Sequence, residues 1–256
     1  MKKILIFGAN GMLGSELAFY LLKKKNFNTI LTVRRLDTVK NFKFYKKYNI
    51  IDKIDVTNNI TVEKVIQKIK PDIVVNCIGI IKQNLRNKDL KSIFQVNSFF
   101  PRYLSYLSAK YNFRFIHIST DCVFSGVDGN YSENDVPSPI DEYGASKLNG
   151  EVYGSNAVTI RTSFIGHEYK SSNGLLEWFL SQKVRCTGFN RAIFSGLPST
   201  VFAQIVRDIV IPRTDLSGLY HVGANPISKY DLICLIAKVY GKSIDIIQDN
   251  EFVIDR

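Results

Sequence analysis

The chain lacks the features that mark disulfide-rich, zinc-binding or membrane-spanning proteins. Its 256 residues contain four cysteines with no C-x-x-C pair, at Cys77, Cys122, Cys186 and Cys234. Scattered thiols of this kind favour reduced cysteines in a cytoplasmic protein over a disulfide framework or a zinc site. The three histidines show no metal-binding spacing, so we expect no metal. No apolar run reaches the roughly 18 residues that a membrane helix needs, so we expect no membrane span.

Acidic residues are scarce relative to basic ones. The chain has 23 Asp and Glu against 34 Lys and Arg, which gives a net charge of +11. A basic balance can indicate nucleic-acid binding. Here the lysines are spread along the chain and do not form one block interleaved with aromatic residues, so we expect no nucleic-acid partner. A solvated surface, or attraction for a small phosphate-bearing substrate, fits the charge better.

What the chain does contain is a regular alternation of strand-like and helix-like patterns. Short apolar runs ended by glycine or polar residues predict strands at residues 4–7, 29–33, 51–56, 73–77, 114–118 and 157–161. Helical spacing of apolar residues predicts helices at 15–24, 61–69, 90–111 and from 143 to about 153. Such alternation predicts an α/β fold with a doubly wound parallel sheet.

Beyond residue 161 the alternation becomes looser. Helices are expected at residues 173–180, 201–211 and 228–240, with a strand at 219–222 and a turn-rich loop at 188–199. We therefore expect residues 1–165 to form a Rossmann-type NAD(P)-binding domain. Residues 166–256 are expected to form a small C-terminal substrate-binding lobe that is partly interwoven with it.

A glycine-rich turn follows the first expected strand and opens the first helix. Its glycines are Gly8, Gly11 and Gly14. Backbone amides and a helix N-terminus can hold a pyrophosphate, and glycine permits its close approach. A glycine triplet alone is more often a plain turn, but the strand before it and the helix after it favour a dinucleotide site.

Two arginines at the end of the second expected strand bear on the choice of dinucleotide. An acid at this place favours NAD, whereas an arginine favours the 2′-phosphate of NADP. The chain has Arg34 and Arg35 here, and no acid before Asp37. Two ordinary surface arginines are the alternative. Asp55 and Val56 close the third expected strand, where an acid can face the adenine or cap the next helix.

Tyr143 and Lys147 lie one helical turn apart, downstream of Thr120. A phenol with a pKa near 10 is a poor proton donor or acceptor at neutral pH, and we expect the neighbouring ammonium to lower that pKa. Thr120 can hydrogen-bond a substrate oxygen, and Asn97 is expected to brace Lys147 through water. A Y-x-x-x-K pair is common by chance, but with Thr120 and the glycine turn it predicts proton handling beside a hydride carrier.

These motifs together resemble the extended short-chain dehydrogenase/reductases, and more narrowly the dTDP-4-dehydrorhamnose reductase family of sugar-nucleotide reductases. The resemblance rests on Gly8-Ala-Asn-Gly-Met-Leu-Gly14, Val75-Asn-Cys-Ile-Gly79, Val96-Asn97, Ser119-Thr-Asp-Cys-Val-Phe-Ser-Gly126, Tyr131-Ser-Glu133 and Tyr143-Gly-Ala-Ser-Lys-Leu-Asn-Gly-Glu151. It covers roughly residues 1–165 well and is looser beyond them. One departure is Cys122, where the family usually has a tyrosine.

The resemblance implies a Rossmann fold, NADPH as hydride donor, and reduction of a 4-keto group on a nucleotide-diphosphate 6-deoxysugar for polysaccharide precursors. It assigns the catalytic roles to Thr120, Tyr143 and Lys147. It counts Asn97 among the cofactor contacts and adds to them Asn10, Met12, Leu13, Cys77, Ile78 and Gly79. It also implies substrate contacts at Lys82, Cys122, Val123 and Phe124. The expected partner is the nucleotide-sugar substrate, and a homodimer is possible.

Four side chains beyond the motifs are further candidates for contacting the substrate. His167 follows Gly166, where the cleft should open. Trp178 and Phe189 are candidates for stacking on the nucleotide base, although packing within the fold is the alternative. Arg191 is a candidate for pairing with the substrate pyrophosphate.

Two other functions share this fold. A sugar-nucleotide 4,6-dehydratase places an Asp-Glu pair just after the catalytic threonine, whereas here Asp121 is followed by Cys122. Epimerases and dehydratases keep a tightly held NAD and usually an acid after the second strand, which Arg34 and Arg35 do not supply. A non-catalytic NADP-binding regulatory subunit is the remaining alternative, and the intact Tyr143 and Lys147 count against it.

Overall fold

A single sheet of seven parallel strands forms the centre of the computed structural model, which describes residues 1–24, 26–39, 43–81, 89–168 and 174–256. The strands in spatial order are β3 (Asn49–Ile51), β2 (Phe27–Thr32), β1 (Lys2–Phe7), β4 (Ile73–Asn76), β5 (Arg114–Ile118), β6 (Ala157–Arg161) and β11 (Gly218–His221). The strand order reverses between β1 and β4. The predicted doubly wound parallel sheet is therefore confirmed.

Strand β1 is apolar throughout its buried part because both of its faces are covered. Ile4 and Ile6 belong to one core cluster, while Leu5 and Phe7 belong to another, and all four are fully buried. The alternation of side chains along a strand therefore splits the core into two layers.

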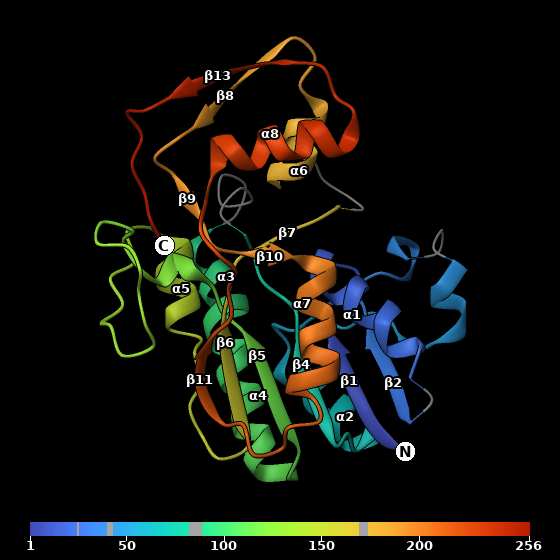
Figure 1. Cartoon of the computed structure of the whole chain (residues 1–256). Helices are drawn as coiled ribbons and strands as arrows, with labels where there is room; N and C mark the ends of the chain where they lie inside the picture. Colours follow the sequence, from blue (N-terminus) through green and yellow to red (C-terminus); the bar gives the residue numbers. More distant parts are fainter. Residues whose placement is uncertain (25, 40–42, 82–88, 169–173) are drawn as a thin grey trace.

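Helices cover the two faces of the sheet (Figure 1). On one face α1 (Met12–Leu22) packs against α7 (Ser199–Ile205), with Leu17 and Phe202 in the shared core. On the other face lie α2 (Asn59–Ile69) and α4 (Phe100–Tyr111). The helix expected at 90–111 is one continuous helical segment, in which α3 (Leu90–Phe94) and α4 are joined by a π-helical turn, Gln95–Phe99, that carries Asn97.

A smaller lobe lies beyond the carboxyl ends of the strands (Figure 1). In it β8 (Arg185–Phe189) pairs with β13 (Asp245–Asp249), and these strands pack with α6 (Leu175–Ser181) and α8 (Lys229–Tyr240) around a core of its own. Two short strand pairs join it to the sheet: β7 (Phe164–Ile165) with β10 (Leu197–Pro198), and β9 (Ile193–Phe194) with β12 (Ile227–Ser228).

The segment between these parts of the lobe returns to the main sheet. Helix α7 packs on α1, and β11 extends the sheet beside β6. Residues expected in the C-terminal lobe are thus physically part of the sheet layer, because the sheet buries their apolar faces and the lobe does not. The functional division at residue 165 remains a prediction.

Four expectations about local structure were wrong. The third strand ends at Ile51, and the loop after it places Asp55 in a tight turn where its carboxylate accepts hydrogen bonds from Thr57. Asn58 caps α2 in its place. The helix that carries Tyr143 is α5 (Glu142–Leu148) and ends before residue 153, because Gly150 packs directly on the Asn97 carbonyl. The expected loop 188–199 contains β9 and β10, and no sequence pattern predicted β13.

Candidate active site

A cleft of about 810 Å³ lies where the strand order reverses, between the sheet and the lobe. Open α/β sheets bind ligands at this point, because neighbouring loops diverge to opposite faces there. The sheet side of the lining includes Met12, Gly79 and Thr120, and the lobe side includes Trp178 and Phe189. The cleft therefore joins the two regions that the sequence predicts for cofactor and substrate.

The glycine turn forms the floor of the cleft at the end of β1. Gly8 adopts a φ of +83°, and a side chain at Gly14 would collide with the Gly8 carbonyl. These two positions accordingly require glycine. Gly11 caps α1 without a side-chain hydrogen bond, and Gly11, Met12 and Leu13 line the cleft. The uncapped helix N-terminus fits a bound pyrophosphate.

Neighbouring residues complete this wall of the cleft. Asn10 lines it and donates a hydrogen bond to the Thr38 hydroxyl at 3.0 Å. Cys77, Ile78 and Gly79 follow β4 and also line it. The structure therefore gathers the predicted cofactor residues Asn10, Met12, Leu13, Cys77, Ile78 and Gly79 around the glycine turn.

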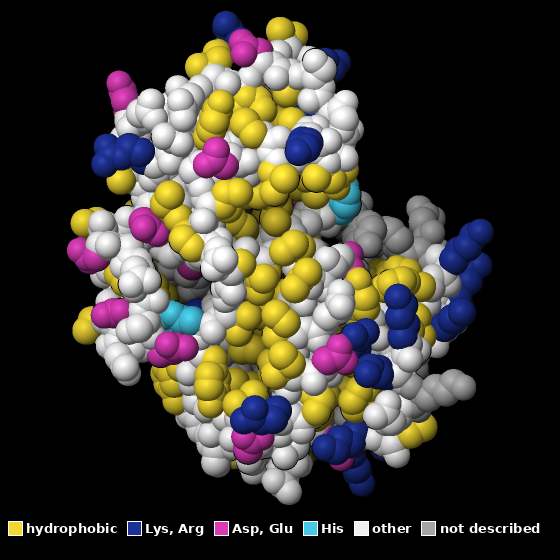
Figure 2. Space-filling model, in the orientation of Figure 1, with side chains coloured by type: hydrophobic (Ala, Val, Ile, Leu, Met, Phe, Trp, Pro, Cys, Tyr) yellow, Lys and Arg dark blue, Asp and Glu magenta, His cyan; other side chains and the backbone are white. Residues whose placement is uncertain are grey.

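The two arginines after β2 are exposed, and neither is among the described residues that line the cleft. Arg35 forms a two-pronged ion pair with Asp37, in which Nε lies 3.2 Å from Oδ1 and Nη2 lies 2.7 Å from Oδ2. Figure 2 shows that basic side chains gather on this side of the molecule. Asp55 and Val56 are not among the described residues that line the cleft, and Val56 is buried in the core.

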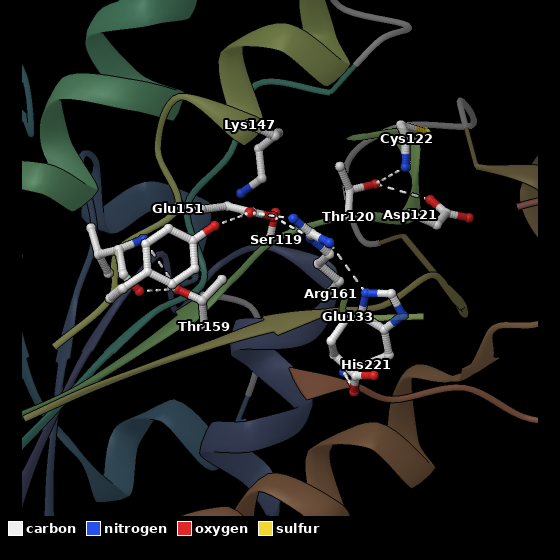
Figure 3. Close-up of polar contacts among 12 residues, drawn as sticks. Ser119, Thr120, Asp121, Cys122, Glu133, Lys147, Glu151, Thr159, Arg161 and His221 are labelled. Atoms are coloured by element: carbon white, nitrogen blue, oxygen red, sulfur yellow. Dashed lines mark hydrogen bonds and ion pairs between the residues drawn. The ribbon is translucent and has the colours of Figure 1, made fainter. Parts of the chain in front are cut away.

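Thr120, Tyr143 and Lys147 converge on the cleft from β5 and α5. Lys147 is 4% exposed, and its Nζ donates a hydrogen bond of 2.6 Å to the carbonyl of Ile118, the last residue of β5. The Thr120 hydroxyl donates to Asp121 at 3.0 Å and accepts from the Cys122 amide at 3.2 Å (Figure 3). The predicted catalytic residues are thus brought together.

Burial controls the protonation of this group. It lowers the pKa of Lys147 to about 8, against the opposing effect of Glu151. It raises the pKa of Tyr143 above its ordinary value, aided by Cys122 and opposed by hydrogen bonding from Thr120. The expected lowering of the Tyr143 pKa by Lys147 is therefore wrong for the cofactor-free protein. Tyr143 is a neutral phenol at physiological pH and can act as a proton donor.

Asn97 supports the site from behind the cleft. Its amide accepts from the Ile80 amide at 2.8 Å and donates to the Ile80 carbonyl at 3.0 Å. It also donates to the hydroxyl of Ser146 at 2.9 Å, next to Lys147. Asn97 is not among the described residues lining the cleft. Asn97 is thus bonded directly to α5, and its expected brace of Lys147 through water stays a prediction.

The predicted substrate residues divide into three groups. Cys122, Trp178 and Phe189 line the cleft. Val123 and Phe124 are buried core residues that do not line it, because the loop after β5 turns inward and Phe124 stacks on Tyr131.

The other three predicted substrate residues lie elsewhere. His167 is exposed and held outside the lining, with its ring nitrogens 2.6 Å from the Glu177 carboxylate and 2.8 Å from the Tyr240 hydroxyl. Arg191 is exposed and is also outside the lining. Lys82 lies outside the described residues.

The sequence reasoning missed Arg256, which enters the cleft beside Cys122. Its Nη1 lies 3.2 Å from the Cys122 sulfur, and its buried Nε has no partner among the described residues. The segment leading to it is held by Asp255, whose amide donates to the Gly126 carbonyl at 2.9 Å. No local motif marks Arg256, because only the tertiary path of residues 250–256 brings it to the site.

A family model described as RmlD substrate binding domain matches residues 1–253. The chain belongs to this family. Among curated relatives, a dTDP-4-dehydrorhamnose reductase of Aggregatibacter actinomycetemcomitans is 28% identical over 254 residues, which cover 92% of this chain and 78% of that protein. The methionine adenosyltransferase 2 subunit beta of Mus musculus is 24% identical over 260 residues, covering 93% and 72%.

Solved structures of the same family share the fold. A dTDP-4-dehydrorhamnose reductase from Bacillus anthracis in complex with NADP superposes with a TM-score of 0.76 at 24% identity, covering 98% of this chain and 85% of that one. Within the described part of this family member, no helix is long and apolar enough to cross a membrane. The same residues contain no group of three His, Cys, Asp or Glu side chains that could hold a metal ion.

Burial of the Lys147 amine should lower the free energy of unfolding of this protein. Its pKa is about 8 in the folded protein against 10.5 for the free group, so the unfolded state binds more protons between these values and stability should rise with pH across that window. Lys147→Met should therefore raise the free energy of unfolding at neutral pH by about 1–3 kcal/mol. Urea denaturation at several pH values measures this.

Lys242 provides the matched control for this experiment. It also donates to backbone carbonyls, those of Leu180 at 3.0 Å and Gln182 at 2.6 Å, but it is only half-buried. Lys242→Met should leave stability unchanged or lower it. A Lys147→Met protein that is less stable than the wild type at every pH would contradict the prediction.

Proposed function

We propose that the protein reduces the 4-keto group of a nucleotide-diphosphate 6-deoxysugar with NADPH. The observation that carries this proposal is the meeting of Thr120, Tyr143 and Lys147 with an uncapped glycine-turn helix in one cleft. The family membership and the relatives named as dTDP-4-dehydrorhamnose reductases support it. A cytoplasmic location and a homodimer remain predictions.

The cofactor half of the cleft fits NADPH, which supplies the hydride when bound. Met12 and Leu13, at the start of α1, line the place of the pyrophosphate, while the Gly11 amide donates to the Gly8 carbonyl at 3.1 Å. Arg34 and Arg35 stand after β2, where they can pair with a 2′-phosphate. Lys147 is positioned to hold the nicotinamide ribose.

Tyr143 donates the proton in this reaction. The ketone carbon C4 gains the hydride, and its oxygen gains a proton from the phenol, so that C=O becomes CH–OH. The Thr120 hydroxyl, which donates to Asp121 in the cofactor-free protein, turns to donate its one proton to this oxygen and so orients it. The burial that keeps Tyr143 protonated suits it to the role of acid.

The substrate half of the cleft combines an apolar wall with one guanidinium. Trp178, Phe189 and Phe252 supply aromatic surface for a nucleobase. Arg256 faces a thiol whose pKa burial raises to about 12, so Cys122 stays neutral and does not cancel the positive charge. We assign the substrate diphosphate to Arg256 in place of Arg191.

A regulatory subunit is the second candidate, because the mouse relative is named as a subunit of methionine adenosyltransferase. The distinguishing test is NADPH oxidation with a panel of 4-keto-6-deoxysugar nucleotides that differ in base and sugar. Turnover of one panel member supports the reductase. NADPH binding without turnover of any of them favours the subunit.

Removing the phenol proton should stop the chemistry and spare binding. Tyr143→Phe keeps the ring and should lower kcat by about 10²–10⁴-fold, as is typical for loss of a general acid. Its NADPH affinity should stay within about twofold of the wild type. Steady-state kinetics and fluorescence titration measure the two quantities. A near-normal kcat would show that the proton comes from another group.

Cofactor preference should depend on the arginines after β2. Arg34→Ala/Arg35→Ala should weaken NADPH binding roughly ten- to hundredfold, because it removes a charge-assisted contact of about 1.5–3 kcal/mol. NADH binding should hardly change. Arg213→Ala is the control, since Arg213 forms a similar exposed ion pair with Asp215 away from the cleft. Equal losses for NADPH and NADH would refute the assignment.

Substrate diphosphate binding should distinguish Arg256 from Arg191. Calorimetry with dTDP and with thymidine, in the presence of NADP⁺, compares Arg256→Met with Arg191→Met. Arg256→Met should weaken dTDP binding about tenfold or more and leave thymidine unchanged. Arg191→Met should behave as wild type. The reverse pattern would restore the sequence-based assignment.

A further inference from the structure

A fully buried ion pair lies directly behind the proposed catalytic residues. Glu151 is 3% and Arg161 4% exposed, and two hydrogen bonds of 2.8 Å join the guanidinium Nε and Nη2 to the two carboxylate oxygens. Burying two charges costs solvation free energy that their attraction does not always recover, so such a pair is weak evidence for a stabilising role. The contacts of the pair indicate a role in positioning the residues at the end of β5.

The Glu151 carboxylate holds the end of β5 from below the cleft. Its Oε1 accepts a hydrogen bond of 2.7 Å from the hydroxyl of Ser119, the residue before Thr120. Its Oε2 accepts a hydrogen bond of 2.8 Å from the Tyr153 hydroxyl. With Arg161, each carboxylate oxygen has two donors, so the side chain is fixed in one orientation.

Lys147 forms a hydrogen bond with Ile118, the residue before Ser119 at the end of β5. Its Nζ donates to the Ile118 carbonyl, while Glu151 holds Ser119. Figure 3 shows the Lys147 amine directed towards the Glu151 carboxylate, which lies between Lys147 and Arg161. Lysine and glutamate therefore fix successive residues beneath Thr120 and present opposite charges to each other.

We propose that Glu151 is a positioning residue for the reduction: its carboxylate anchors Ser119 beneath Thr120 and is the negative charge that keeps Lys147 an ammonium. This inference rests on the proposed function for its effect on turnover. Its effect on Lys147 itself does not depend on any substrate.

The other groups around Lys147 do not supply this charge. Cys77 faces it from the end of β4, and burial raises the pKa of that thiol to about 12. His117 faces it from β5, and burial holds the pKa of the imidazole well below its usual value. Tyr143, one turn earlier on α5, is a neutral phenol. Glu151 is the group that opposes burial most strongly in setting the pKa of Lys147.

The groups beyond Glu151 explain its own environment. Arg161 reaches past the carboxylate to the ring of His221, with Nη1 3.3 Å from Nε2. The backbone amide of His221 donates to Glu133 at 2.7 Å. Burial lowers the pKa of His221, so its ring is neutral at physiological pH. Arg161 therefore faces Glu151 as its main counter-charge.

The test follows the titration of Lys147 in the cofactor-free protein. NMR of ¹³C-labelled lysine, with Lys147→Met to assign the signal, gives the pKa of the amine directly. Glu151→Gln should shift this titration down by about one pH unit or more, since a nearby negative charge is lost. With NADPH and the substrate found in the panel, the alkaline limb of the kcat profile should move down equally, while KM changes little.

Three variants separate charge from packing. Tyr153→Phe removes one hydrogen bond from the same carboxylate but keeps its charge, so the titration should not move. Glu151→Asp restores the charge and should bring the titration back towards wild type. Glu63→Gln removes a carboxylate that accepts hydrogen bonds from Tyr103, Lys110 and Tyr111 far from the cleft, and should have no effect on Lys147.

A fourth variant covers the case in which Glu151→Gln does not fold. Glu151→Met/Arg161→Met replaces the buried pair with apolar side chains of similar volume, a change that folds tolerate. We expect this double variant to fold and its Lys147 to titrate at a lower pH than in the wild type. An unchanged Lys147 titration in either folded variant would overturn it, as would an equal shift in Tyr153→Phe.

Discussion

The site depends on one hydrogen bond, from the buried Lys147 amine to the carbonyl of Ile118. It joins α5 to the end of β5 and thereby sets Tyr143 against Thr120. Burying an amine is unfavourable unless it is paired and hydrogen-bonded. The Ile118 carbonyl and the Glu151 carboxylate offset part of that cost from adjacent points of the structure. Loss of either would move the proton donor as well as the lysine.

The surrounding fold positions the residues that line the cleft. Parallel strands bring β1, β4 and β5 to the same edge, so the glycine turn, the Cys77–Gly79 segment and Thr120 share one cleft. Asn97 fixes Ile80 and Ser146 from a π-helical turn, which adds a second support for α5. The lobe closes the cleft with aromatic side chains. The proposed catalytic residues are therefore held by hydrogen bonds from several elements of the fold.

The sequence predicted the parts of this arrangement that depend on local pattern. Apolar runs between helical segments located β1, β5 and β6 closely, and the glycine turn located the cofactor wall. Side-chain placement in the lobe was not predictable in this way. Arg191 and Arg256 carry the same charge and lie far apart in the sequence, and only the pairing of residues 250–256 with Gly126 and β9 brings Arg256 into the cleft. The burial that raises the Tyr143 pKa is likewise a tertiary effect.

In the proposed reaction, hydride passes from NADPH to C4 of a nucleotide-linked 4-keto sugar. Incubation with NADPH carrying deuterium at the transferable position, followed by mass spectrometry and NMR of the product, tests it most directly. One deuterium at C4 is expected for each NADP⁺ formed. NADPH oxidation that leaves the sugar nucleotide free of deuterium would contradict it.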